Sequence, residues 1–447
     1  MGRRRVREVD IRVSAVSADG LGEGEIDGRR VRIRNGLPGE EVTTRILKRR
    51  GGVWFSEAQS IRHPSVDRRR PACEAFPRCG GCAMQHLDYE VGLQLKSQSV
   101  FVELDRHGIV PRLVRASVSG PRLHYRHKAR LGVRCLPAKS GGEAGDELLV
   151  GFRESFSSRV ARISDCKVLA VPLAGLLPDL QATLGKLNQK HRIPQVEVVA
   201  GDVEQAFIVR HLEPLDKADR EHLTGLARRH GIRAYLQAGG YDTLELLWPR
   251  SAEPWLTYSI IDFGLTYRFY VTDFIQVNPY MNRMLASSVA CAVCPEPGIV
   301  VADLFCGIGN FSLVVARLGG LVKGYEANAG AIARAQTNAA LNGLASRCEF
   351  RVADLYDPDY ELPADVQQLL LDPPRSGAGP HLDVWLRSRA LQRVVYISCN
   401  PVTFASDAAV LIKNGFTLAE VGIFDMFPHT SHVETLGVFV REAAQAG

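Results

Sequence analysis

At residues 299–311 the sequence is Ile-Val-Val-Ala-Asp-Leu-Phe-Cys-Gly-Ile-Gly-Asn-Phe. It begins with an apolar run rich in β-branched residues, which predicts a strand, and continues into a glycine-rich turn and the start of a helix. Gly307 and Gly309 let the backbone approach a ligand closely at the amino end of that helix. This order of elements predicts an open, Rossmann-like α/β sheet with a cofactor site at the carboxyl end of the strand.

Acidic residues around the turn indicate which cofactor binds there. A nicotinamide-binding turn would have a third glycine, but Ser312 occupies that position, and Asp303 stands four residues before the first glycine. Asp303 suits the cationic amino group of S-adenosylmethionine. Glu326 ends a second predicted strand 23 residues later, about where a ribose diol needs an acceptor, and Asp354 ends a third apolar stretch directed toward the adenine. Together these strand-end acids predict a methyltransferase that uses S-adenosylmethionine.

Two further apolar runs end in rigid polar turns. Residues 369–375 are Leu-Leu-Leu-Asp-Pro-Pro-Arg, and residues 394–401 are Val-Val-Tyr-Ile-Ser-Cys-Asn-Pro. Because neighbouring parallel strands end at the same edge of a sheet, we expect Asp372 and Cys399 to face one cleft. A free cysteine is most often a small buried side chain. A thiol at a strand end that is stopped by Asn-Pro instead favours a reactive role.

The composition predicts a soluble protein with more than one core. The chain has 447 residues, of which 46% are hydrophobic, enough for two or three domains. No apolar run approaches the roughly 18 to 20 residues of a membrane span. The arginines at residues 3–5 lead into no apolar signal segment. We therefore expect a cytoplasmic protein with no membrane partner. A monomer is the expectation for the oligomeric state, which the sequence does not determine.

Positive charge is concentrated at the amino end. Residues 1–70 contain 17 Lys and Arg against 10 Asp and Glu, whereas the whole chain has a net charge of +6. Short alternating stretches, separated by a loop over 20–24, predict a small β-barrel of the oligonucleotide-binding type. Its basic clusters suit an RNA phosphate backbone, with a solvated structural face as the alternative. A second candidate phosphate track lies on one face of a predicted strand and contains Arg126, Lys128 and Arg130, with a solvated basic face as the alternative.

Four of the ten cysteines have an organised spacing. Cys73, Cys79 and Cys82 form a C-x5-C-G-G-C run, and Cys166 is the best fourth ligand. Disulfides are not expected in a cytoplasmic chain. Three neighbouring thiolates and one distant thiolate favour a [4Fe-4S] cluster, with zinc as the alternative. Cys306 is expected to pack in the glycine-rich turn, and the remaining cysteines are interpreted as core or surface residues without partners: Cys135, Cys291, Cys294 and Cys348.

Over nearly its full length the chain resembles the RNA uracil-C5 methyltransferases, most closely the 23S ribosomal RNA type named RlmD. Residues 1 to about 65 resemble the TRAM domain of that family, and the organised cysteines match its iron-sulfur ligands. Relatives that act on transfer RNA lack the cluster, and a second ribosomal relative lacks the TRAM segment, so the presence of both favours the RlmD type. Five segments match the methyltransferase signatures in order: 274–278, 303–310, 372–375, 398–401 and 432–435.

The resemblance implies roles for individual residues. Cys399 would be the nucleophile and Glu434 the base. A [4Fe-4S] cluster would be bound by Cys73, Cys79, Cys82 and Cys166. The cofactor site would be lined by Gln276, Phe305, Asn310, Glu326, Asp354 and Asp372. Asp372 would alternatively hold the target base.

The chemistry of uracil explains why both a thiol and a carboxylate are needed. C5 is too weakly nucleophilic to attack a methyl sulfonium until a thiolate adds at C6 and turns the ring into an enolate. A base must then remove the C5 proton. The apolar residues around Glu434 are expected to raise its pKa for that task, unless it is an exposed glutamate at a strand start. His432 is interpreted as a structural neighbour.

The target uridine must also be accessible. A paired uracil hides C5 and C6, so we expect 23S ribosomal RNA to present an unpaired or flipped uridine. Phe274 is a candidate stacking surface for that base, and a core phenylalanine is the alternative.

The predicted organisation combines β and multidomain α/β parts. It consists of a TRAM-like OB-type barrel at 1–68, an iron-sulfur segment at 69–92, a helical segment packing on the catalytic domain at 93–123, a β-rich central domain at 124–270 and a Rossmann-like methyltransferase domain at 271–447. A non-catalytic RNA-binding protein would need neither Cys399 nor Glu434. An amino-group methyltransferase would have an aromatic residue in place of Arg375 and no thiol. Transfer RNA or another ribosomal site is the remaining alternative for the substrate.

Overall fold

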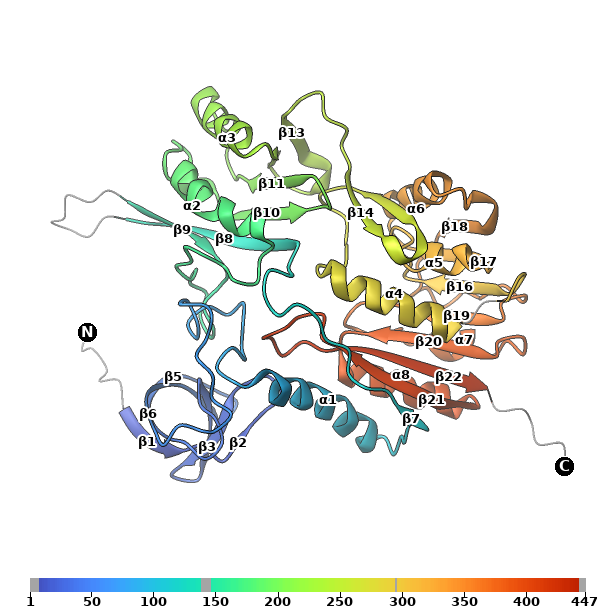
Figure 1. The fold of residues 1–447 in the computed structure, drawn as a ribbon, viewed down its shortest axis with the longest axis horizontal. Helices are drawn as coiled ribbons and strands as arrows, with labels where there is room; N and C mark the ends of the chain where they lie inside the picture. Colours follow the sequence, from blue (N-terminus) through green and yellow to red (C-terminus); the bar gives the residue numbers. More distant parts are fainter. Residues whose placement is uncertain (1–7, 138–145, 294–295, 442–447) are drawn as a thin grey trace.

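The computed structural model describes residues 8–137, 146–293 and 296–441, so the arginines at 3–5 and Cys294 lie outside the described residues. Three main sheets organise the chain (Figure 1): an amino-terminal sheet, a middle sheet and a large sheet formed mainly by the carboxyl-terminal third. Among the helices described, none combines the length and the apolar character that a bilayer crossing requires.

The amino-terminal sheet has the strand order β1-β5-β6-β4-β3-β2, in which only the β4–β6 pair is parallel. It curls until β1 lies against β3. A Cβ added at Gly24 would approach Ile11 Cγ2 to 2.7 Å, so this close contact requires glycine. The predicted loop over 20–24 is too long, because β3 already begins at Gly22. The strands are β1 Glu8–Arg12, β2 Ala15–Val16, β3 Gly22–Ile26, β4 Arg29–Arg34, β5 Glu41–Arg50 and β6 Val53–Arg62.

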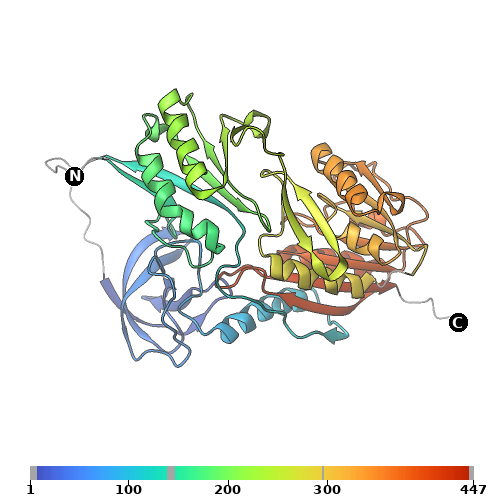
Figure 2. The same ribbon diagram turned by 45° about the horizontal axis from the view of Figure 1, so that its top comes forward.

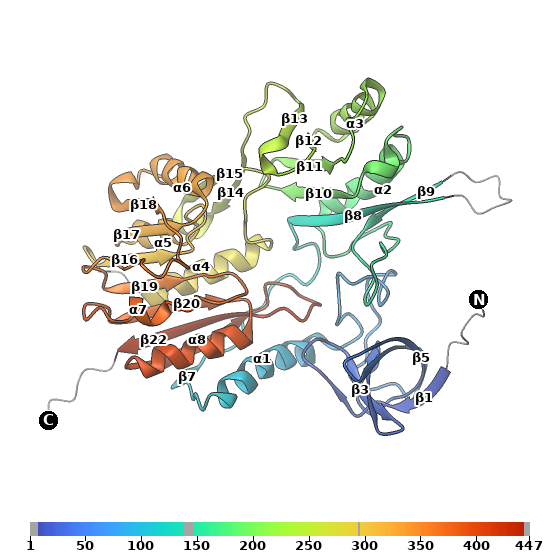
Figure 3. The same cartoon turned by 180° about the vertical axis from the view of Figure 1, so that it is seen from behind.

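A segment of turns joins this sheet to the first helix. Residues 63–88, which contain the cysteine run, form turns and isolated bridges. Helix α1 (Tyr89–Arg106) begins after Asp88, whose carboxylate accepts hydrogen bonds from the first-turn backbone N–H groups. The helix lies beside α8 (Pro401–Lys413), as Figure 3 shows, and buries Val100 and Leu104 there. The short strand β7 (Leu113–Val114) then joins the edge of the large sheet.

The middle sheet has the order β13-β12-β11-β10-β8-β9. Helices α2 and α3 cover one of its faces (Figure 2), so the region predicted to be β-rich also contains two long helices. The elements are β8 Lys128–Leu136, β9 Glu147–Gly151, α2 Val171–Gly185, η1 Lys190–Arg192, β10 Gln195–Ala200, β11 Gln205–Arg210, α3 Lys217–His230, β12 Arg233–Gln237, η2 Tyr241–Thr243 and β13 Leu244–Trp248.

Lys128 is not available to the predicted phosphate track at the start of β8, whereas Arg130 remains exposed. Lys128 Nζ donates to the backbone carbonyls of Val271 and Asp273 at 2.8 and 2.6 Å, so this side chain faces the protein. Arg130 pairs with the buried carboxylate of Glu197 at 2.7 Å. Both cations are satisfied within the fold, and Lys128 ties the middle sheet to the segment that follows β15.

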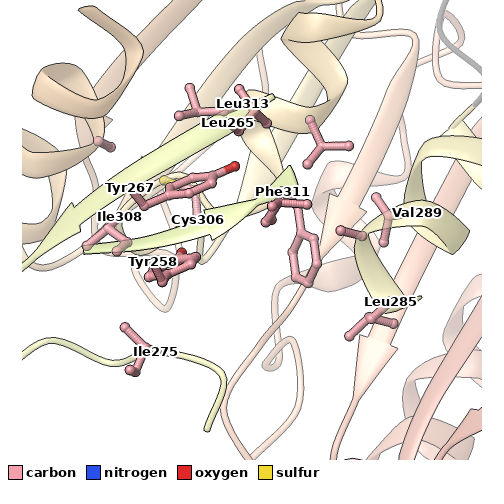
Figure 4. Packing of buried hydrophobic residues seen from close by; sticks show 14 of the residues in the cluster. Tyr258, Leu265, Tyr267, Ile275, Leu285, Val289, Cys306, Ile308, Phe311 and Leu313 are labelled. Carbon is pink, nitrogen blue, oxygen red and sulfur yellow. The ribbon is translucent and has the colours of Figure 1, made fainter. Parts of the chain in front are cut away.

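A hairpin connects the middle and large sheets. It consists of β14 (Leu256–Ile260), η3 (Ile261–Phe263) and β15 (Leu265–Phe269), and it packs on α4 and α6. Figure 4 shows Tyr258 and Tyr267 of the hairpin beside Cys306 and Phe311 of the glycine-rich turn. The hairpin belongs to the predicted central domain, and its side chains share one core with residues of both the middle sheet and the large sheet. Cys306 is buried in this core, as predicted.

The large sheet has the order β18-β17-β16-β19-β20-β22-β21-β7, and its strands from β18 to β20 are parallel. Helices α4, α5 and α6 pack on one face and α1, α7 and α8 on the other, which explains the continuous apolar runs. The predicted α/β fold is therefore confirmed. The elements are α4 Pro279–Val293, β16 Val300–Leu304, α5 Ser312–Arg317, β17 Leu321–Glu326, α6 Ala329–Leu341, η4 Ala345–Arg347, β18 Cys348–Val352, β19 Gln368–Leu371, α7 Leu382–Trp385, β20 Arg393–Ser398, α8 Pro401–Lys413, β21 Phe416–Phe424 and β22 Glu434–Arg441.

Candidate active site

A cavity of about 590 Å³ opens at the carboxyl edge of the large sheet, next to β16, where the strand order reverses. Strand-end residues from β16, β17, β19 and β20 meet there, as the sequence predicts. The predicted site residues that line the cavity are Gln276, Phe305, Asn310, Glu326, Asp354, Asp372, Cys399 and Glu434. Asp303, Phe274, Arg375 and His432 line it as well.

The glycine-rich turn after β16 has an unusual backbone. Phe305, Gly307 and Gly309 have φ angles of 65°, 53° and 86°. A Cβ added at Gly307 would meet no atom within 4 Å, so glycine is needed there for its conformation and not for space. A positive φ at a bulky residue such as Phe305 is energetically costly and is found mainly at functional sites. Phe305 and Gly307 of this turn line the cavity.

Asp303 provides an unsatisfied acceptor at this turn. The side chain is only 1% exposed; its Oδ2 accepts a hydrogen bond from Ser312 Oγ, while Oδ1 has no partner among the described residues. Burial raises the pKa of Asp303 to about 7, although hydrogen bonds from Ser312 oppose this shift. A buried carboxylate oxygen without a donor suits a cationic ligand group.

Asn310 is held by residues that sequence reasoning missed. Its Oδ1 accepts from Tyr258 Oη at 2.9 Å and from Asn282 Nδ2 at 3.0 Å, and its Nδ2 donates to Asn282 Oδ1 at 2.9 Å. One N–H of the Asn310 amide is left for a ligand. Tyr258 and Asn282 lie in the hairpin and in α4, and no sequence pattern marked either of them.

Glu326 and Asp354 each keep an oxygen available. Glu326 Oε1 accepts from the backbone N–H of Asn328 at 2.9 Å, and Asp354 Oδ1 accepts from that of Tyr356 at 3.0 Å. The second oxygen of each carboxylate is unused by these turns. Both groups can therefore accept hydrogen bonds from a polar ligand.

Cys399 and Glu434 come together through strand pairing. In the antiparallel β20–β22 pair, Ser398 is opposite Thr435, so the next residues along the two strands are Cys399 and Glu434. Glu434 is 4% exposed, and burial, followed by the charge of Asp372, raises its pKa well above the usual value. The prediction of a raised pKa for Glu434 is thus correct. The charge of Asp372 is a second cause of the shift that the sequence did not indicate. The alternative of an exposed glutamate is excluded.

The pKa of Cys399 is raised by burial and then by the charge of Glu434, while Arg375 lowers it. Arg375 Nη2 also lies 3.2 and 3.3 Å from the two ring nitrogens of His432. Burial lowers the pKa of His432 to about 4, with Arg375 as the second cause, so the ring is neutral at pH 7. Asn400 Nδ2 donates to the Arg375 carbonyl at 2.9 Å and so joins the two strand-end turns.

Phe274 and Gln276 border the mouth of the cavity. Phe274 is 76% exposed, which excludes the core alternative for this ring. Gln276 Nε2 lies 3.5 Å from Asp372 Oδ2. Burial raises the pKa of Asp372 to about 7, with the charge of Asp303 as the second cause.

The four organised cysteines line one small cavity in a different part of the molecule. Burial raises the pKa of Cys79 and of Cys82 to about 12, and the neighbouring thiols add to the shift. A Cβ added at Gly81 would lie 2.9 Å from the ring of Phe152, so this turn needs glycine to close. Four cysteines around one cavity suit a soft, thiolate-binding metal centre. The set comprises Cys73, Cys79, Cys82 and Cys166.

Cys135 is not isolated, contrary to the prediction. Its Sγ lies 4.0 Å from His191 Nε2, and Asp146 completes a group of potential ligands. Lys190 Nζ already lies 3.5 Å from the carboxylate of Asp146, so a cation is present in this group. Local spacing did not reveal the group, because His191 comes from a segment 45 or more residues away from Cys135 and Asp146.

Comparison with known proteins gives consistent results. A family model described as tRNA (Uracil-5-)-methyltransferase matches residues 344–443. A protein of Azoarcus sp. strain BH72, named 23S rRNA (uracil(1939)-C(5))-methyltransferase RlmD, is 40% identical over 96% of this chain and 99% of its own length. A protein of the same name from Hahella chejuensis is 37% identical over 99% of this chain and 100% of its own.

Among solved structures, a Pyrococcus abyssi tRNA (uracil-54, C5)-methyltransferase in complex with S-adenosyl-L-homocysteine has a similar fold. The TM-score is 0.73 at 22% sequence identity, over 96% of this chain and 99% of that one. The likeness covers the whole architecture and supports the multidomain α/β methyltransferase fold.

Proposed function

Since the chain belongs to the RlmD family of 23S ribosomal RNA uracil-C5 methyltransferases, we propose that it transfers a methyl group from S-adenosylmethionine to C5 of a uridine in 23S ribosomal RNA. The names of the full-length relatives specify uridine 1939, and this is the site we propose. The same names favour ribosomal RNA over the transfer RNA alternative.

One observation carries this function: a strand-end thiol and a buried carboxyl group lie next to each other in the cavity that also contains the glycine-rich turn. A non-catalytic RNA-binding scaffold would not require this arrangement. An amino-group methyltransferase would have no use for the thiol.

Cys399 is the proposed nucleophile. Its thiolate forms a bond to C6 of uracil, and the electrons of the C5=C6 double bond move into the ring as an enolate. When S-adenosylmethionine is bound, it supplies a methyl group on a positively charged sulfur. C5 bonds to that methyl carbon, and the electron pair of the broken carbon–sulfur bond stays on the sulfur. Glu434 then takes the C5 proton, the C5=C6 bond re-forms, and the thiolate of Cys399 leaves.

Neighbouring residues support these steps. The positive charge of Arg375 stabilises the thiolate of Cys399, since it lowers the pKa of that thiol. Neutral His432 contacts the Arg375 guanidinium without adding charge. Asp372 interacts electrostatically with both Asp303 and Glu434, so we place it at the border between the cofactor and the target base.

The cofactor residues fit S-adenosylmethionine. The unpartnered Oδ1 of Asp303 suits the amino group, and the backbone around Gly307 is open to a ligand. We propose that the methionine, ribose and adenine parts are bound by Gln276, Phe305, Asn310, Glu326, Asp354 and Asp372.

The cysteine group fits an iron-sulfur cluster. We assign Cys73, Cys79, Cys82 and Cys166 as ligands of a [4Fe-4S] cluster, because four thiols meet in one small cavity and the cysteine spacing matches the family. A bound cluster would supply a compact cross-link between the cysteine run and the segment before α2. Gly80 and Gly81 let the run pack closely against Arg153 and Phe152.

The amino-terminal sheet is the proposed TRAM domain and RNA contact. Its exposed basic residues at the β5–β6 turn include Lys48, Arg49 and Arg50. We further propose that the target uridine is unpaired or flipped, with Phe274 stacking on the base, and that the protein acts as a monomer. The five domain boundaries given above remain proposals.

The test of this function is mass-spectrometric mapping of 5-methyluridine in 23S ribosomal RNA from cells with and without the protein. Purified wild-type protein should methylate the RNA fragment around that uridine. Cys399→Ala should give neither product nor covalent adduct while still binding the cofactor. Full turnover by Cys399→Ala would refute the nucleophile assignment.

A further inference from the structure

The segment that ends at Glu434 is a long turn between the last two strands, and we call residues 425–433 the base loop. It leaves β21 at Phe424 and enters β22 at Glu434. Phe427 and His432 of this loop line the active-site cavity. In Figures 1 and 2 the loop extends from the large sheet toward the segment that contains the cysteine run. The conformation of the base loop therefore determines the position of Glu434 at the start of β22.

A buried lysine from a distant helix bonds to the base loop. Lys96 of α1 is 2% exposed, and its Nζ donates to Asp425 Oδ1 at 2.6 Å and to the Phe427 carbonyl at 2.9 Å. The other oxygen of Asp425 accepts from Tyr89 Oη at 2.7 Å. The free-energy cost of removing two charges from water often exceeds the electrostatic attraction between them in the protein interior. Such a pair is more readily explained by a positional role than by stability.

Hydrogen bonds connect Lys96 to the active site through the loop. The Phe427 carbonyl that accepts from Lys96 also accepts from Thr430 Oγ1 at 2.8 Å. Thr430 Oγ1 in turn accepts from the backbone N–H of His432 at 3.2 Å. The ring of Phe427 meets the ring of His432 edge-on at 5.6 Å. The network therefore ends at His432, two residues before Glu434 in the chain.

The amino-terminal part of the chain holds the same loop at a second point. The backbone N–H groups of Ala83 and Met84, just after the cysteine run, donate to the His429 carbonyl at 2.8 and 3.0 Å. Tyr125 Oη donates to the Pro428 carbonyl at 3.0 Å. The loop is thus fixed by segments that are distant in sequence from the large sheet.

Other side chains of α1 supply the apolar contact that docks the helix. Val100 and Leu104 of α1 are fully buried against the core that α8 shares, and they supply apolar contact for docking. The polar bonds of Lys96 are made to the base loop and not to α8. Helix attachment and loop fixation therefore rest on different side chains.

We propose that Lys96 is a positioning residue for the base step: it fixes the base loop so that Glu434 reaches the C5 proton after methyl transfer. This inference rests on the proposed function, because it assigns Lys96 to one step of that reaction. A misplacement of about 1 Å in a catalytic group can reduce the rate 100-fold. The step that depends on Glu434 should be slowed, whereas the earlier addition by Cys399 should not.

The test compares three proteins at full length. Because Lys96→Met alone would leave Asp425 buried without its cation, the test variant is Lys96→Met/Asp425→Asn, which removes both charges and keeps an acceptor for Tyr89; it is compared with the wild type. The control is Glu103→Gln, which removes an exposed ion pair with Arg106 on the same helix. Each protein is assayed for turnover on the RNA fragment, cofactor affinity and trapping by the fragment with 5-fluorouridine at the target.

We expect the double variant to turn over about 10- to 100-fold more slowly, to be trapped by 5-fluorouridine RNA at the wild-type rate and to bind the cofactor normally. Protein–RNA adduct with ordinary uridine should accumulate on denaturing gels. Unchanged turnover would overturn the proposal, and so would a parallel loss of turnover, trapping and cofactor affinity, which indicates a general structural role. If the wild-type protein makes neither product nor adduct, the proposed function fails instead.

Discussion

Replacing Glu434 by glutamine should separate the two halves of the reaction. The side chains have nearly the same size, and Glu434 is 4% exposed, so the substitution opens no cavity in the core. It removes the carboxylate that would accept the C5 proton. Loss of a general base lowers a rate by about 100- to 10,000-fold, and we expect turnover to fall by that factor.

The addition step should respond in the opposite direction. The charge of Glu434 is the second cause, after burial, of the raised pKa of Cys399, and Arg375 opposes it. Without that charge the pKa of the thiol falls, so a larger fraction of Cys399 is thiolate in the pH range where Glu434 of the wild type has lost its proton. Glu434→Gln should therefore add to C6 at least as fast as the wild type, and methylated RNA should remain attached to the protein.

The assay measures 5-methyluridine by mass spectrometry and the RNA–protein adduct by denaturing electrophoresis, over a range of pH. Because burial raises the pKa of Glu434, wild-type turnover should increase with pH as this group loses its proton, and the variant should lose that rise. Glu420→Gln, on the neighbouring strand β21 and partly exposed, is the matched control. Wild-type turnover by Glu434→Gln would refute its role as base. An inactive variant without adduct would place Glu434 before methyl transfer.

Three further predictions concern the other parts of the chain. Protein purified without oxygen should be brown and contain about four irons per chain. The Cys166→Ser variant should lose most of the iron, and the control variant Cys291→Ser should keep it. A protein with one zinc and no iron would contradict the cluster assignment. Lys48→Gln/Arg50→Gln should weaken RNA binding and leave cofactor affinity unchanged. The slope of the logarithm of the binding constant against the logarithm of the salt concentration should become shallower by up to about 0.9 per lost phosphate contact. An unchanged slope would show that this turn does not contact RNA. The affinity for S-adenosylmethionine, measured by calorimetry, should fall as the pH drops below about 7, because burial raises the pKa of Asp303 to about 7 and the protonated acid cannot pair with the amino group. The Asp303→Asn variant should bind weakly at every pH. A wild-type affinity that does not change with pH would contradict this pairing.

Much of the fold and of the site can be predicted from the sequence. The family and the α/β methyltransferase fold, both inferred from the sequence, are confirmed by the full-length relatives and by the similar solved structure. Prediction succeeds here because the relevant signals are local. An apolar run ended by Asp-Pro-Pro or Cys-Asn-Pro specifies both a strand and the side chain at its end. Parallel strands then bring those ends to one edge.

Other features depend on which segments pack together. The alternation of residues along the strand predicts an exposed Lys128. Its side chain instead points inward, because the segment after β15 places two carbonyl groups beside it. Tyr258 and Asn282 orient Asn310 from two elements that the sequence does not link to the glycine-rich turn. The interaction of Lys96 with the base loop joins residues more than 300 positions apart.

The sequence by itself determined the strand ends, their polar residues and the cysteine spacing, because these follow from the preferences of a few neighbouring residues. Only the tertiary structure decided which charges are buried and which groups they meet. Burial controls the pKa of Glu434, Asp372 and Asp303, and burial is a property of the packed elements around a side chain. No local pattern contains that information, since the neighbours that remove water come from distant parts of the chain.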